Sequence, residues 1–158
     1  MKRMNKKDLQ IIAHLRNDGR MQLTKLSSLT GMPLSTVFDK LRYSEKELIT
    51  KYICLLDFSK LGYNLRVNIA IRVGQNKDDV GDFLVKNQSV NSVSKVTNGY
   101  DFMIEGVFKQ IKDLEEFMEQ LETKFKIEDK KYFFILEDLK KEGFLSNPDL
   151  VEDSNKTI

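Results

Sequence analysis

The hydrophobic pattern of this chain changes its period near residue 65, and this change limits the fold more than any other feature. Before that point apolar residues recur at helical spacing; the clearest set, at i, i+3, i+4 and i+7, is Leu34, Val37, Phe38 and Leu41. From Leu65 to Val73 nearly every second residue is a large apolar one, which is typical of a half-buried strand. The sequence therefore predicts a helical domain followed by a domain built on a sheet.

The formal charge changes sign between the first third of the chain and the remainder. Residues 1–52 contain 11 Lys or Arg and 5 Asp or Glu, a net charge of +6, whereas residues 53–158 contain 15 and 19, a net charge of −4. A basic first third favours contact with a polyanion such as nucleic acid. The alternative is an ordinary solvated surface.

Composition limits the classes of function. No stretch approaches the ~18 apolar residues of a membrane span, and no apolar signal core follows the basic N-terminus, so we expect a cytoplasmic protein without membrane contact. Cys54 and His14 are the only residues of their kind, which excludes an internal disulfide and a zinc finger. We expect Cys54 to be buried and inert and His14 to be structural. Neither a catalytic triad pattern nor a phosphate-binding glycine loop occurs, so we expect no enzyme activity and no cofactor.

The first third predicts a helix-turn-helix. Leu9 to Leu15 form a helical apolar face, Thr24 is a plausible N-cap for a short second helix that ends at Gly31, and a third helix starts near Pro33 and continues through Leu48. The following residues, 49–56, are expected to form a wing or connecting strand. We therefore assign residues 1–52 to a winged helix-turn-helix DNA-binding domain.

The remainder predicts the order β-α-β-β-α-β. Strands are expected at 65–73, 90–97, 100–108 and 131–136, with a hairpin at Asn98-Gly99. One helix is marked by Val80, Phe83 and Leu84 and ends at about residue 87, and a second covers 111–125. The expected fold class is α+β, a winged helix-turn-helix plus a ferredoxin-like βαββαβ domain. The boundaries are 53–64 for a connecting strand and linker, 65–139 for an oligomerisation and effector domain, and 140–158 for a tail with a short helical extension and a loose end. The open face of the sheet needs a cover, either a second copy or the tail.

The third helix is the candidate DNA reader, because it has an apolar back and a polar front that suits the major groove. Val37, Phe38 and Leu41 are expected in the core. A solvated helix surface is the alternative interpretation of the front. The expected base-reading residues are Ser35, Thr36, Asp39, Lys40 and Tyr43, and the expected phosphate contacts are Arg20, Lys25, Arg42, Lys46 and Lys51.

Several short stretches carry a likeness to a known family: 8–15, 17–20, 26–32, 35–41, 60–63 and 97–102. Their order and spacing resemble the Lrp/AsnC family of prokaryotic transcription regulators. The family often has serine at Pro33 and a basic residue at Asp39, so the DNA preference or the docking angle is expected to differ from that of relatives at these two positions. It also often has a glycine that is missing here between Ser44 and Ile49.

This resemblance implies a homodimer or higher homo-oligomer that binds double-stranded DNA and responds to a small effector such as an amino acid. In the family such effectors bind near the hairpin, which here contains Gly99, Tyr100 and Asp101; the alternative is a tight turn in which Asp101 only bonds backbone. The leading hypothesis is a sequence-specific regulator. Two others are a ligand-binding or enzymatic ferredoxin-like protein with a helical appendage, and an architectural protein that wraps DNA.

Overall fold

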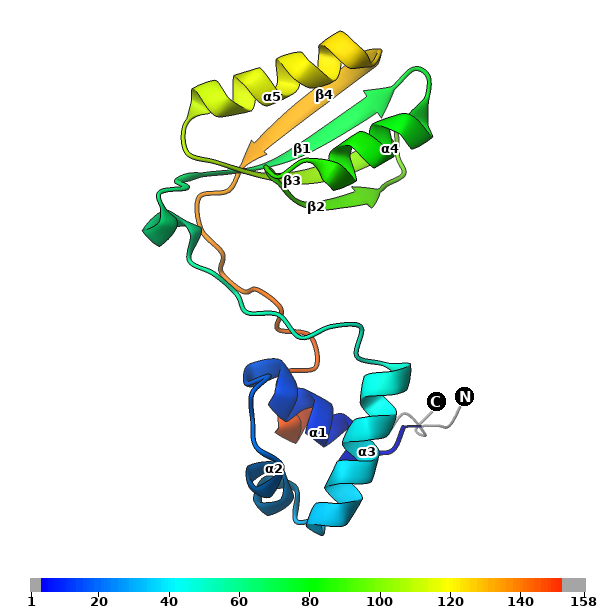
Figure 1. Cartoon of the computed structure of the whole chain (residues 1–158), viewed down its shortest axis with the longest axis vertical. Coiled ribbons are helices and arrows are strands. Elements are labelled where there is room, and N and C mark those ends of the chain that lie inside the picture. The colour runs from blue at the N-terminus through cyan, green and yellow to red at the C-terminus, as the bar shows by residue number, and fades with distance from the viewer. Residues whose placement is uncertain (1–3, 152–158) are drawn as a thin grey trace. The chain divides into compact units, whose positions relative to one another are not determined.

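The computed structural model describes residues 4–151 of the chain (Figure 1). It divides into two compact units, one formed by Met1–Leu55 with Leu139–Ile158 and the other by Leu56–Asp138. Within the described residues, no helix is both long and apolar enough to cross a membrane.

The helical unit contains α1 (Lys6–Asn17), α2 (Leu23–Thr30) and α3 (Leu34–Glu47). A reciprocal capping box starts α1, while α2 begins after Gln22 rather than at the predicted cap Thr24. Gly31 ends α2 with φ of 66°, a left-handed conformation that glycine adopts without steric cost. The core of the three helices consists of Ile11, Leu15, Leu26 and Val37.

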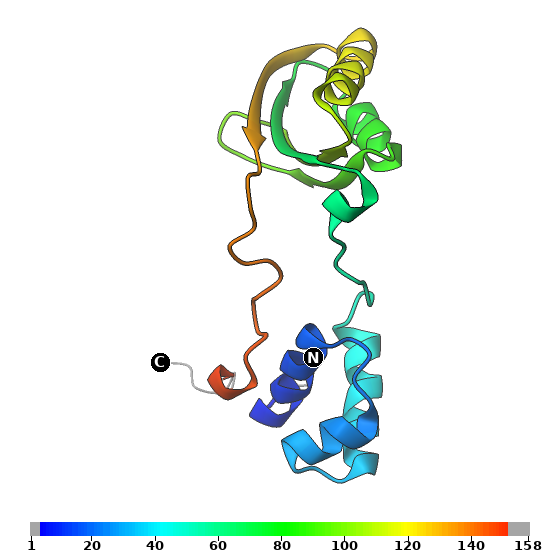
Figure 2. The ribbon, with the colours of Figure 1, turned by 90° about the vertical axis from the view of Figure 1, so that its left-hand side faces the viewer.

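The C-terminal segment packs against α1 and belongs to this helical unit (Figure 2). The Arg16 guanidinium lies 3.0 Å from the Glu142 carboxylate, and the Asn17 amide donates to the Ser146 carbonyl. Val151 is only 3% exposed, next to a single 3-10 turn, Pro148–Leu150. The sequence predicted a short helical extension and a loose end, and it gave no sign of this docking. Residues 152–158 lie outside the described part.

The second unit is a four-stranded antiparallel sheet with two helices on one face (Figure 2). The strand order is β2-β3-β1-β4, and the chain order is the predicted βαββαβ. β4 starts four residues earlier than predicted. The elements are β1 (Leu65–Val73), α4 (Lys77–Lys86), β2 (Val90–Lys95), β3 (Phe102–Phe108), α5 (Ile111–Lys124) and β4 (Ile127–Phe134).

The two faces of the sheet differ in polarity. Alternate residues of β1 from Val67 to Val73 are buried with the apolar face of α5 in one continuous core. On the other face, the Arg66 guanidinium donates to Glu105 at 2.9 Å and to Asp138 at 2.6 Å, and Phe133 is half exposed. The open face is therefore a mixture of ion pairs and apolar surface.

Residues 49–56, predicted to form a wing or connecting strand, are not a strand in the described single chain. These residues are extended, and within the described chain no strand pairs with them; a 3-10 turn, Phe58–Leu61, follows. A strand requires a neighbour for its backbone groups, and the apolar pattern alone does not supply one. Cys54 lies in this segment and is exposed, so the prediction that it is buried was wrong.

Candidate nucleic-acid interface

The turn between α2 and α3 has its backbone carbonyls satisfied by nearby side chains. The Ser27 hydroxyl donates to the Met32 carbonyl at 2.6 Å, and the Lys7 ammonium donates to the Thr30 carbonyl at 2.5 Å. Pro33 occupies the N-cap of α3 and makes no side-chain cap. The turn therefore places α3 without the capping hydroxyl that is usual at such a position.

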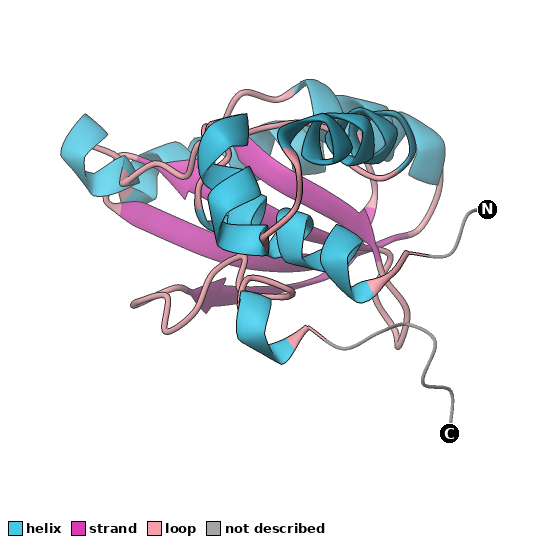
Figure 3. Ribbon diagram, turned by 90° about the horizontal axis from the view of Figure 1, so that it is seen from below, coloured by secondary structure: helices cyan, strands magenta, loops and turns pink. Residues whose placement is uncertain are grey.

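α3 is one of the helices drawn in cyan in Figure 3. Its outward face carries several of the predicted DNA-contacting residues. Ser35, Asp39, Arg42 and Lys46 are exposed on this helix. Thr36 and Tyr43 are partly buried at its margins. This face offers hydroxyl, carboxylate and cationic groups, which are the groups that bond base edges and phosphates in the major groove.

Phe38 is exposed, which corrects the prediction that it belongs to the core. Its side chain is 44% exposed, and that of Leu34, one turn earlier, is 47% exposed. The inward row of α3 is narrower than the apolar pattern indicates, because the buried residues are Val37 and Ser44, with Leu41 packed beside them. A short three-helix core can cover only one row of α3.

Lys40 of α3 is paired with a residue of α1. Its ammonium forms an ion pair with the Asp8 carboxylate, and both side chains are largely buried. Asp8 also accepts the backbone N–H of Asn5 at 2.8 Å as part of the α1 cap. No local sequence signal pointed to this pair, because its members are 32 residues apart. The role of Lys40 as a DNA contact stays a prediction.

Substituting Lys40 with methionine separates the two roles, because the aliphatic stem is kept while the charge is lost. We expect the variant to lose about 1–2 kcal/mol of unfolding free energy, between the values for exposed and buried pairs. Chemical denaturation measures this, with Lys46→Met as the exposed control. Unchanged stability together with weaker DNA binding would assign Lys40 to the DNA instead.

The remaining predicted phosphate contacts are exposed on separate elements. Arg20 follows α1, where its backbone N–H donates to the Asp18 carboxylate at 3.0 Å, Lys25 lies on α2, and Lys51 lies in the extended segment. Lys46 has the Glu47 carboxylate 3.8 Å from its ammonium. Exposed ion pairs of this kind are weak, so the positive charge of Lys46 is available to phosphates.

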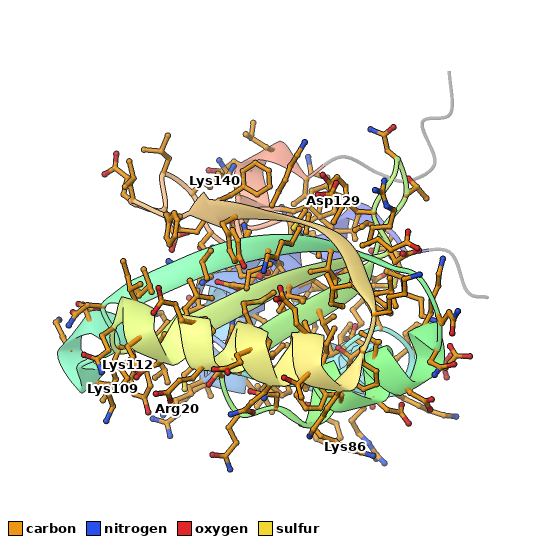
Figure 4. All side chains as sticks on the ribbon, turned by 90° about the horizontal axis from the view of Figure 1, so that it is seen from above. Arg20, Lys86, Lys109, Lys112, Asp129 and Lys140 are labelled. Atoms are coloured by element: carbon orange, nitrogen blue, oxygen red, sulfur yellow. The ribbon has the colours of Figure 1, made fainter. Side chains whose placement is uncertain are left out.

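The predicted effector residues Gly99, Tyr100 and Asp101 lie in the loop that joins β2 to β3. Asn98 and Gly99 both have positive φ, 67° and 91°, as a tight turn requires. The Tyr100 hydroxyl donates to the carboxylate of Asp129 on β4 at 3.0 Å. Asp129 is labelled in Figure 4. The Asp101 carboxylate accepts the Val73 N–H at 2.8 Å and the Lys77 ammonium at 2.6 Å. Asp101 thus anchors the hairpin, and an effector ammonium group there must compete with Lys77.

The hydrogen bond from Lys77, followed by that from the Val73 backbone, lowers the pKa of Asp101. A lowered pKa stabilises the fold above the unfolded-state value of about 3.9, and this stability is lost as the pH falls through the folded-state pKa. We therefore expect Asp101→Asn to be less stable than the wild type near neutral pH, with a difference that shrinks below about pH 4. Denaturation across that range measures it. The control is Asp78→Asn, at a side chain that is 97% exposed; an equal pH dependence in both variants would contradict the anchor.

A second candidate ligand site is an open groove of about 550 Å³ between α5 and β4. Its lining includes the apolar or aromatic residues Leu114, Met118 and Tyr132 and the acidic residues Glu119 and Glu122. Lys130 in the same lining is paired with Glu122, which raises the pKa of this lysine. The groove therefore favours a cationic over an anionic occupant. Among the described residues, no group of three His, Cys, Asp or Glu side chains is arranged to hold a metal ion.

Comparison with known protein families and sequences identifies relatives of both units. The family described as the Lrp/AsnC ligand binding domain matches residues 66–145. The HTH-type transcriptional regulator FL11 of Pyrococcus horikoshii is 30% identical over 114 residues, which are 71% of this chain and 76% of that protein. The glutamate uptake regulatory protein of Zymomonas mobilis is 22% identical over 156 residues, 96% of this chain and 95% of the relative.

Solved structures show the same fold. A transcriptional regulator of Neisseria meningitidis in complex with L-methionine matches with a TM-score of 0.78 at 21% identity, covering 87% of this chain and 93% of its own. The Bacillus subtilis protein LrpC matches with a TM-score of 0.81 at 17% identity, covering 89% and 99%. The arrangement of a helix-turn-helix and a ferredoxin-like sheet is therefore shared with these regulators.

Proposed function

Because the chain belongs to the Lrp/AsnC family of transcription regulators, we propose that it binds specific DNA sequences through the outward face of α3. The observation that carries the proposal is the position of Arg42 and Lys46 on the exposed side of the second helix of a helix-turn-helix. In this motif the second helix enters the major groove, where its side chains reach base edges. The net charge of +6 over residues 1–52 also supports DNA binding by this surface, since positive charge attracts phosphates. A regulator of this kind acts in the cytoplasm, where the DNA is.

The proposed active form is a homodimer or a higher homo-oligomer. The extended segment 52–56 supports it, because Tyr52, Ile53, Leu55 and Leu56 are all about half exposed or more and no strand within the described chain pairs with them. A second copy can supply both the apolar cover and the missing strand neighbour. Two α3 helices would then lie about 34 Å apart, one turn of DNA, on a pseudo-palindromic site.

A small effector such as an amino acid is proposed to modulate the protein. The glutamate uptake regulatory protein and the methionine-bound regulator from Neisseria support this class of ligand. The residues proposed to contact it are Gly99, Tyr100 and Asp101, which lie together at the hairpin. A screen of the amino acids for a rise in melting temperature tests this part separately from DNA binding.

The proposal is tested by footprinting the full chain on the DNA upstream of its own gene, together with its mass in solution. We expect a protected, pseudo-palindromic region and a mass of at least two chains. An amino-acid response without DNA affinity at low salt would favour the ligand-binding alternative. Protection that spreads evenly over the fragment would favour an architectural protein that wraps DNA.

A further inference from the structure

The exposed face of α3 carries two large apolar side chains among its polar ones. Leu34 and Phe38 are 47% and 44% exposed and lie four positions apart in the sequence, which places them on one face of the helix. The Arg42 guanidinium lies 5.8 Å from the centre of the Phe38 ring, at the distance of a cation–π contact. Leu34 and Phe38 thus form a short row, which we call the apolar row of α3, and Arg42 lies at its end.

Charge decides which partner covers this row. A second copy docked symmetrically here would bring the same basic surface against itself, because a two-fold contact uses the same patch on both subunits. Arg42 and Lys46 would then face their own equivalents. Asp39 and Glu45 are also exposed on α3, but residues 1–52 as a whole have a net charge of +6. Duplex DNA has the complementary charge, and its phosphates flank the groove on both sides. The charge around the row therefore favours DNA over a second copy.

The major groove of DNA offers an aromatic or aliphatic side chain one apolar partner, the C5 methyl group of thymine. The other groups on base edges are hydrogen-bond donors and acceptors, which a phenyl ring leaves unsatisfied. Leu34 and Phe38 are separated by about 6 Å along the helix axis, close to the length of two base-pair steps. The row therefore matches thymines that lie within a step or two of each other.

Resting on the proposed function, we propose that Phe38, with Leu34 beside it, selects DNA sites by contact with thymine methyl groups. Arg42, stacked on the ring, extends from this contact toward a neighbouring base edge or phosphate. The specificity of the protein then includes A·T pairs read through an apolar contact, in addition to those read by hydrogen bonds. A hydrogen bond cannot supply this discrimination, since the methyl group neither donates nor accepts.

The test removes one methyl group at a time. Each thymine of the footprinted half-site is replaced by deoxyuridine, which differs only in the missing C5 methyl, and the affinity of the full chain is measured. We expect the wild type to lose about fourfold in affinity at one or two positions, as removal of one buried methyl group predicts. Phe38→Ala should bind the thymine site more weakly and show no further loss with deoxyuridine at the position that its ring contacts.

Phe144→Ala is the matched control, since Phe144 is 79% exposed and lies outside α3. This variant should keep the wild-type deoxyuridine pattern. The role of Phe38 is overturned if the protein binds DNA specifically but is insensitive to deoxyuridine, or if the wild type and Phe38→Ala are equally sensitive. Neither result contradicts the proposed function as a DNA-binding regulator. Loss of the dimer in Phe38→Ala with an unchanged deoxyuridine pattern overturns the role of Phe38 in favour of a contact between copies. Absence of any specific binding by the wild type refutes both the role and the function.

The wild-type deoxyuridine scan needs no variant, so a folding defect in Phe38→Ala does not remove the test. Phe38→Leu provides a second variant that keeps an apolar side chain. It should retain sensitivity at the same thymine, because a leucine also packs against a methyl group. A leucine variant that loses methyl sensitivity while binding DNA as tightly as the wild type contradicts the proposal.

Discussion

Replacing Arg42 and Lys46 together with alanine is expected to weaken DNA binding by about 10- to 100-fold near 0.1 M salt. Both side chains are exposed on α3, and each neutralised phosphate releases counterions when the complex forms. The slope of log K against log salt should therefore become shallower by about one to two. Titration of labelled DNA at several salt concentrations measures both quantities.

The control for this variant removes the same charge from the sheet unit. Lys86 ends α4 and Lys112 lies in the first turn of α5 (Figure 4), and both are exposed. Alanine at these two positions should leave the affinity and the salt slope close to those of the wild type. Equal losses in the two double variants would show that the binding follows net charge and not the position of α3.

Ending the chain after Asp138 is expected to destabilise the helical unit by about 2 kcal/mol, the value for burying one valine side chain. The truncation removes Val151 from its buried position and leaves Arg16 and Asn17 without their partners in the tail. The melting temperature of this unit should fall by about 8–16 °C, since a small domain shifts by about 4–8 °C per kcal/mol. Calorimetry of the full and shortened chains measures the difference.

Leu150→Ala is the matched control, because Leu150 lies in the same tail and is 77% exposed. This variant should have the melting temperature of the wild type. Val151→Ala should lose part of the stability that the long truncation loses. Identical melting of the full chain and the chain ending at Asp138 would contradict a structural role for the tail.

The sequence predicted the parts of the fold that local pattern determines. The alternation of β1 predicted its bounds, and the Asn98-Gly99 pair marked the hairpin, because both signals come from neighbouring residues. The strand predicted over 49–56 is absent from the single chain for the opposite reason. An extended apolar segment becomes a strand only beside a partner, and pairing is a property of the whole assembly.

The candidate site could be predicted only in part. The pattern predicted α3 and its exposed Ser35, Arg42 and Lys46, and the structure has these three residues exposed on that helix, while its DNA contact stays a prediction. It also assigned Phe38 to the core, because helical spacing tells which residues share a face but not how wide a face the neighbours cover. The Lys40–Asp8 pair and the burial of Val151 involve residues that are distant in the sequence, so no local sequence pattern could predict these contacts.

The most direct test of specific DNA binding through α3 compares two DNA fragments of equal length over a range of salt concentrations. One contains the footprinted site and the other has the same bases in shuffled order. We predict that the site binds at least about 10³-fold more tightly at physiological salt, and that both affinities fall as salt rises. Equal affinity for the two fragments, or no binding at low salt, would contradict the account.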